Sequence, residues 1–84
     1  MKEKQINKKF NWIQDEIELD FDLCEVLQNE IKKAEKYDLE GCDWKYFLVA
    51  ESIELLGKGL YSGGVITKKQ WNTLCDKYPG EERF

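Results

Sequence analysis

The stretch ITKKQWNTLCDKYPG, residues 66–80, carries the most complete helix signal in the chain. Thr67 and Gln70 have the spacing of a capping box, in which each side chain bonds a backbone N–H of the other residue at the start of a helix. Apolar residues then recur at helical spacing. They are Trp71, Leu74, Cys75 and Tyr78. Because Pro79 cannot continue a helix, the sequence predicts a short amphipathic helix over residues 68–78.

Residues 43–60, which precede this element, predict the longest helix. Apolar residues there form two adjacent lines that together make a wide face. One line is Trp44, Phe47, Leu48 and Leu55, with Glu51 among them, and the other is Tyr46, Ala50, Ile53 and Leu56. Asp43 has the side chain of an N-cap. Gly57 and Gly59 each weaken a helix interior by about 1 kcal/mol relative to alanine, so the helix is expected to end soon after them.

The N-terminal third of the chain supports two interpretations. Between residues 10 and 34, apolar residues recur at steps of three or four, which favours helix. Residues 17–23 also alternate strictly between apolar and acidic, which is typical of a strand. A lone strand would lack a partner, since no other segment alternates. We therefore predict helices over 11–20 and 23–36, with strand over 16–23 as the alternative.

Together these elements predict one all-α domain spanning residues 1–84. Of its residues, 42% are hydrophobic and 13% aromatic, which suits a single modest core rather than a disordered chain. We expect a bundle of three to four helices over 11–20, 23–36, 43–60 and 68–78. Residues 1–9 are expected to be a frayed basic N-terminus and residues 79–84 an irregular tail.

Charge is distributed unevenly along the chain. Residues 1–9 carry four lysines and one acid, a net of +3, whereas residues 10–65 carry five lysines and thirteen acids, a net of −8. No apolar stretch approaches the roughly 20 residues that a membrane-spanning helix needs. None follows the N-terminal lysines either, as a secretory signal would require. We therefore expect a cytoplasmic protein that does not bind membranes.

The residue types exclude most catalytic chemistry. The chain has no histidine, which removes the commonest general base and metal ligand. Its three cysteines include no closely spaced pair, so a zinc site is not expected. The glycines match neither the dinucleotide fingerprint nor the P-loop. We expect no catalytic residue, no cofactor and no bound metal, and therefore no enzyme.

An acidic row is the most distinctive feature of the sequence. On a helix, Asp15, Glu18, Asp22 and Glu25 would share one face, because they are spaced at three, four and three residues. Trp12, directly before them, is of a type that often anchors protein interfaces. We interpret these five residues as a contact surface for a basic protein partner. The alternatives are that the row is only a solvated face and that the Trp12 ring covers a seam between helices.

The leading hypothesis is a non-enzymatic protein-binding module that acts as a regulator, inhibitor or adaptor. Its acidic face could imitate nucleic acid and block a basic partner. Small acidic helical proteins of this kind occur among bacterial and phage regulators and inhibitors. One alternative is a small DNA-binding transcriptional regulator that uses the helix after Thr67, where Lys68 and Lys69 lie, although the net charge of −4 disfavours direct nucleic-acid binding. Another is a structural subunit of a homo-oligomer.

Overall fold

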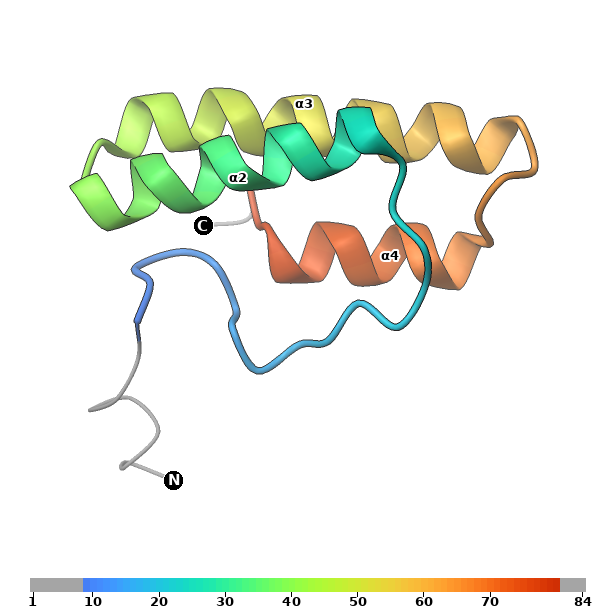
Figure 1. Ribbon diagram of the computed structural model, residues 1–84, viewed down its shortest axis with the longest axis horizontal. Coiled ribbons are helices and arrows are strands. Elements are labelled where there is room, and N and C mark those ends of the chain that lie inside the picture. Colours follow the sequence, from blue (N-terminus) through green and yellow to red (C-terminus); the bar gives the residue numbers. More distant parts are fainter. Residues whose placement is uncertain (1–8, 81–84) are drawn as a thin grey trace.

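Three helices form the regular structure of residues 9–80, which are the residues that the computed structural model describes. They are α2 (Glu25–Glu40), α3 (Asp43–Ser62) and α4 (Lys68–Lys77). The hairpin of α2 and α3 lies on one side in Figure 1, and α4 packs beneath it. Since residues 9–80 contain no strand, the all-α prediction is confirmed.

Helix α4 begins as its sequence predicts. The backbone N–H of Gln70 donates to Thr67 Oγ1 at 3.1 Å, and the backbone N–H of Thr67 donates to Gln70 Oε1 at 2.8 Å. This reciprocal capping box satisfies two N–H groups that the first turn would otherwise leave unpaired. Leu74 is fully buried, so the apolar stripe of α4 faces the core.

A tight turn joins α2 to α3. Gly41 has φ 75°, a left-handed conformation that favours glycine, and its N–H donates to the carbonyl of Asp38 at 3.1 Å. Helix α3 then packs against both α2 and α4. Residues 9–80 share one hydrophobic core. Its buried members are Phe10, Ile13, Leu27, Ile31, Ala34, Tyr46, Val49, Ala50, Ile53, Ile66, Leu74 and Tyr78.

A close approach between α3 and α4 occurs at Gly57. A Cβ atom at this position would lie 2.6 Å from the Trp71 ring, so only glycine fits without movement. The Trp71 ring is held there because its Nε1 donates to the carbonyl of Glu54 at 3.2 Å and its ring stacks on Tyr61. Glycine is therefore required at this point of the helix interior by packing, despite its low helix propensity.

We expect Gly57→Ala to destabilise the fold by about 1–3 kcal/mol, because the added methyl group overpacks this contact. Gly59→Ala is the matched control in the same helix, where a Cβ atom would meet nothing within 4 Å. Its expected effect has the opposite sign, a gain of up to about 1 kcal/mol from helix propensity. Urea unfolding followed by circular dichroism measures both, and a gain from both variants would contradict the close contact.

The prediction of a helix over residues 11–20 is wrong. Residues 11–24, here called the strap, contain bends and turns but no helix, and α2 begins only at Glu25. In Figure 1 the strap runs along α4 on the side away from the helical hairpin. Burial alternates along its second half, where the apolar residues are half-buried and the acids between them are exposed. The strict alternation of residues 17–23 thus matches an alternation of burial in this non-helical segment, although the described residues contain no strand.

The remaining helix predictions are confirmed with shifted ends. The helix predicted over 23–36 lies at Glu25–Glu40, and those predicted over 43–60 and 68–78 lie at Asp43–Ser62 and Lys68–Lys77. The predicted frayed N-terminus and irregular tail fall mainly on residues 1–8 and 81–84, which lie outside the described residues.

Candidate partner-binding surface

A buried carboxylate fixes the start of the strap. Asp38, in the last turn of α2, is 1% exposed. Its Oδ1 accepts the backbone N–H of Asn11 at 2.7 Å, and its Oδ2 accepts those of Trp12 and Ile13, both at 2.9 Å. Hydrogen bonds to an ionised acceptor are roughly twice as strong as neutral ones. Three of them converge on one side chain and hold the strap against the end of α2.

Trp12 lies over the seam between the strap and α3. Its Nε1 donates to Asp43 Oδ1 at 3.0 Å. Its ring packs against Phe47 with 4.9 Å between centroids, and it stacks on Tyr46 at 6.5 Å. Trp12 is half-buried. The alternative interpretation placed this ring over a seam between helices, whereas these contacts place it over α3.

Lys77 fastens the middle of the strap to α4. Its Nζ donates to the carbonyls of Ile17 at 2.6 Å, Gln14 at 3.2 Å and Asp15 at 3.5 Å. The backbone N–H of Gln14 in turn donates to the carbonyl of Lys77 at 2.9 Å. Neither Asp38 nor Lys77 is predicted from the sequence, because a contact from a side chain to distant backbone leaves no periodic signal.

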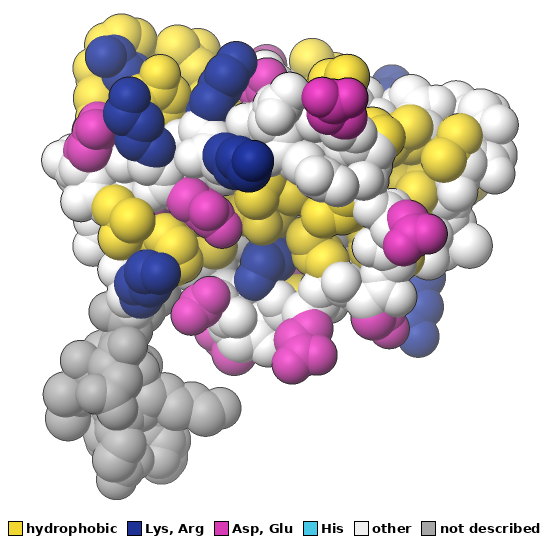
Figure 2. All heavy atoms as spheres, viewed as in Figure 1, with side chains coloured by type: hydrophobic (Ala, Val, Ile, Leu, Met, Phe, Trp, Pro, Cys, Tyr) yellow, Lys and Arg dark blue, Asp and Glu magenta, His cyan; other side chains and the backbone are white. Residues whose placement is uncertain are grey.

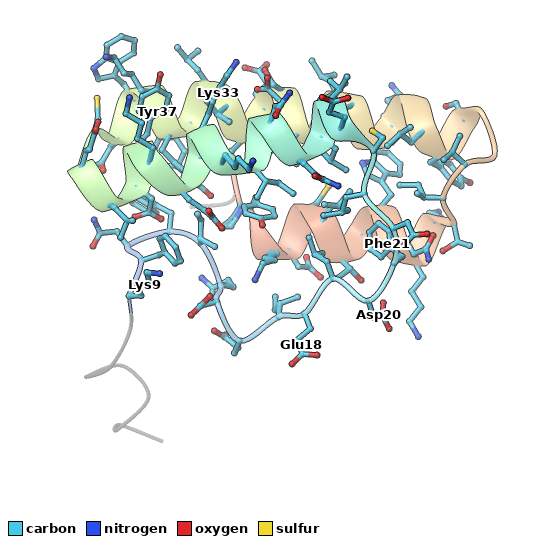
Figure 3. The ribbon with its side chains drawn as sticks, viewed as in Figure 1. Lys9, Glu18, Asp20, Phe21, Lys33 and Tyr37 are labelled. Carbon is cyan, nitrogen blue, oxygen red and sulfur yellow. The ribbon has the colours of Figure 1, made fainter. Side chains whose placement is uncertain are left out.

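The acids of the strap do not form the predicted helical row. Asp15, Glu18, Asp22 and Glu25 are all exposed, but Asp15 lies in a turn, Glu18 and Asp22 lie in irregular chain, and only Glu25 is helical. Figure 3 shows Glu18 and Asp20 pointing away from the helices, whereas Phe21, the residue after Asp20, lies nearer the core. Acidic side chains accordingly gather along the strap edge of the molecule in Figure 2. The outward line therefore includes Asp20, which the helical spacing had left out.

A second exposed surface lies on α3. Trp44, Leu48 and Leu55 are 64%, 56% and 62% exposed, although they are large apolar side chains. They line a hollow of about 860 Å³, and we call its lining the α3 surface. Its described members are Asp43, Trp44, Phe47, Leu48, Glu51, Glu54, Leu55 and Gly80.

The two apolar lines of α3 differ in their exposure to solvent. The line of Tyr46, Ala50 and Ile53 is buried, whereas the line of Trp44 and Leu55 remains exposed. The sequence predicted the whole width as one apolar face and gave no sign of this division. The reason is that α2 and α4 cover one side of α3 and leave the other open.

Carboxylates flank the apolar part of the α3 surface. Asp43, Glu51 and Glu54 belong to its lining, and no lysine or arginine does among the described residues. Lys45 is the only base in residues 43–55, and its Nζ lies 5.7 Å from the centre of the Trp44 ring and 5.5 Å from that of Tyr37 in α2. The α3 surface is thus apolar along its middle and negative at its edges.

Tyr46 is a buried residue that positions part of the α3 surface. Its side chain is fully buried, and its hydroxyl donates to the carbonyl of Pro79 at 3.0 Å. This bond positions the Pro79-Gly80 segment, and Gly80 completes the described lining of the hollow. Burial raises the pKa of Tyr46 far above its usual value near 10, and the charge of Asp38 adds to this shift.

Within residues 9–80, no group of three or more His, Cys, Asp or Glu side chains is arranged to hold a metal ion. Lys68 and Lys69 are exposed in the first turn of α4. No helix in the described part of the chain is long and apolar enough to cross a membrane. The chain matches no protein-family model, and no curated protein or solved structure is significantly similar to it.

Proposed function

We propose that this protein is a non-enzymatic protein-binding module, a regulator, inhibitor or adaptor, that contacts its partner through the α3 surface. The observation that carries the proposal is the exposure of Trp44, Leu48 and Leu55, each more than half accessible, on one line of one helix. Scattered apolar residues are normal on a protein surface, whereas several large ones that line one hollow are typical of a binding site. Tryptophan is also enriched among the residues that dominate binding energy.

The dimensions of the surface favour a protein partner over a small ligand. From Trp44 to Leu55 the helix advances about 16 Å at 1.5 Å per residue. The hollow is open to solvent rather than enclosed, whereas sites for small molecules surround most of the ligand. A long, open apolar line is suited to another protein segment laid along it.

Capture from a host lysate tests this function when it is done with matched variants. Leu48→Ser/Leu55→Ser shortens two side chains of the α3 surface. Val26→Ser/Val65→Ser is the control, since these valines are 57% and 68% exposed elsewhere on the molecule. All four side chains are largely exposed, so each pair should change stability by no more than about 1 kcal/mol.

We expect a protein retained by the wild type and by the valine control to fall more than tenfold in abundance with the leucine variant, as measured by quantitative mass spectrometry. Circular dichroism verifies that both variants fold. Equal retention by the two variants would contradict the proposal. Light scattering on the same samples would reveal a homo-oligomer, which is the structural-subunit alternative.

The acidic strap supports a second candidate, in which the protein imitates nucleic acid to block a basic partner. Glu18, Asp20 and Asp22 are exposed on alternate residues of the strap. Alternate residues of extended chain are about 6.6 Å apart, whereas one DNA strand carries a phosphate every ~3.4 Å of axis. The exposed acids of the strap therefore have about half the linear charge density of one DNA strand. For this reason we rank imitation of nucleic acid below binding through the α3 surface. Under this candidate, Glu18→Lys/Asp20→Lys would abolish capture and the leucine variant would not.

A further inference from the structure

We propose that the partner segment on the α3 surface is a basic amphipathic helix, an inference that rests on the function proposed above. The first support is spacing. Trp44, Leu48, Glu51 and Leu55 follow one another at steps of four, three and four. This is the seam spacing of two helices that pack side by side, where each side chain fits between those of the facing helix.

An extended peptide is a poorer occupant. Residues 43–62 are helical, so their backbone N–H and C=O groups bond one another along α3. Strand addition draws its affinity from unpaired backbone groups at a sheet edge. The α3 surface offers side chains alone, and a helix presents its own side chains at a matching period.

Charge decides which kind of helix fits. Glu51 interrupts the apolar line between Leu48 and Leu55 and is exposed, while Asp43 and Glu54 lie to the sides. The ammonium of Lys45 lies over the rings of Trp44 and Tyr37. A partner helix with lysine or arginine beside its apolar stripe would therefore be complementary, and an acidic one would be repelled.

The same geometry disfavours a second copy of this chain. Two α3 helices paired in parallel would place each Glu51 directly opposite the other. In the antiparallel pairing that sets Leu48 opposite Leu55 of the second copy, the two-fold axis passes between residues 51 and 52 and again brings the Glu51 side chains together. Like charges directly opposed at a seam are destabilising. Self-association through this surface thus carries a penalty that a basic partner avoids.

The probe is a pair of designed helical peptides of about 18 residues, five turns long. The basic peptide has leucine along its seam, one central seam lysine to face Glu51, and lysine at the flanking positions. The acidic peptide has glutamate in place of every lysine. Fluorescence anisotropy with the full chain gives the dissociation constants, and amide shifts in NMR spectra locate the site. We expect the basic peptide to bind at least tenfold more tightly than the acidic one, with the largest shifts at Trp44, Leu48 and Leu55.

Charge-reversal variants separate a specific seam from general attraction. Glu51→Lys/Glu54→Lys and the strap variant Glu18→Lys/Asp20→Lys change the net charge by the same amount. With Glu51→Lys/Glu54→Lys, the acidic peptide should bind more tightly than the basic one. With Glu18→Lys/Asp20→Lys, the basic peptide should still bind more tightly than the acidic one. Equal weakening by both variants, or no binding of the basic peptide at 1 mM, overturns the inference.

The outcomes also distinguish this inference from the proposed function. If neither peptide binds while lysate capture still depends on Leu48 and Leu55, the helical basic partner is wrong and the protein-binding surface stands. If capture is indifferent to Leu48 and Leu55 as well, the proposed function fails. A dimer that disappears in Leu48→Ser/Leu55→Ser would replace the basic helix with a second copy of this chain.

Discussion

Replacing Asp38 with alanine is expected to reduce the free energy of unfolding by about 3–5 kcal/mol, because several backbone donors lose their acceptor at once. The substitution leaves the backbone N–H groups of Asn11, Trp12 and Ile13 without their acceptor. An unsatisfied buried donor costs about 1–3 kcal/mol. The hydrogen bond of Ile13 is buried, whereas those of Asn11 and Trp12 are part-buried, so water would recover part of their loss. A domain of this size has only about 3–5 kcal/mol of stability, so Asp38→Ala should be largely unfolded at 25 °C.

Urea unfolding followed by circular dichroism measures this loss, at low temperature if the variant is unfolded at 25 °C. Glu40→Ala is the control, because Glu40 lies two residues further along the same helix and is exposed. Its expected effect is within about 0.5 kcal/mol. Asp38→Asn keeps one acceptor oxygen and should fall between the two. A loss below about 1 kcal/mol for Asp38→Ala would contradict the role given to its carboxylate.

The second large effect is a loss of stability at alkaline pH. Tyr46 and Tyr78 are 0% and 3% exposed, and burial raises the pKa of both well above the ordinary value near 10. Nearby acidic charges raise it further: Asp38 beside Tyr46, and Glu35 and Asp15 near Tyr78. The folded protein therefore keeps two phenolic protons that the unfolded chain releases above about pH 10.

The sign of the effect follows from this difference. The stabilisation is fully present below about pH 10, where both states hold the protons, and is lost as pH rises above it. Each group contributes about 1.4 kcal/mol per pH unit, so the free energy of unfolding should fall by roughly 2–3 kcal/mol between pH 10 and 11. Urea unfolding at half-unit steps from pH 8.5 to 11 gives the slope. The variant Tyr46→Phe/Tyr78→Phe should be less stable at neutral pH but should lose most of this slope; an unchanged slope would contradict the assignment.

Local signals predicted α3 and α4 because those signals act within one turn. The Thr67 and Gln70 side chains cap α4 through neighbours three residues away, so sequence spacing is enough to find them. The paired apolar lines of α3 similarly specify a helix without reference to the rest of the chain. The exposure of Trp44 could not be predicted from local signals, because it depends on which other helices pack on α3.

The strap was mispredicted because its sequence satisfies two periods at once. Ile17 and Phe21 fit a helical step of four, and they also fit the alternation of residues 17–23. Asp38 and Lys77 hold the strap in its non-helical conformation. They lie 25–27 and 60–63 residues from the strap atoms that they bind. Buried carboxylates and lysines that bond distant backbone have no sequence pattern, so the two residues that position the strap could be found only from the structure.

Lys77 has a consequence for the order in which the chain is assembled during translation. Its ammonium binds the carbonyls of Gln14 and Ile17, 63 and 60 residues earlier. A ribosome that adds about 5–20 residues per second needs about 3–12 s to travel from one to the other. Throughout that interval the nascent strap lacks the contacts between its carbonyls and Lys77. The strap can therefore take its folded position only after α4 has been synthesised.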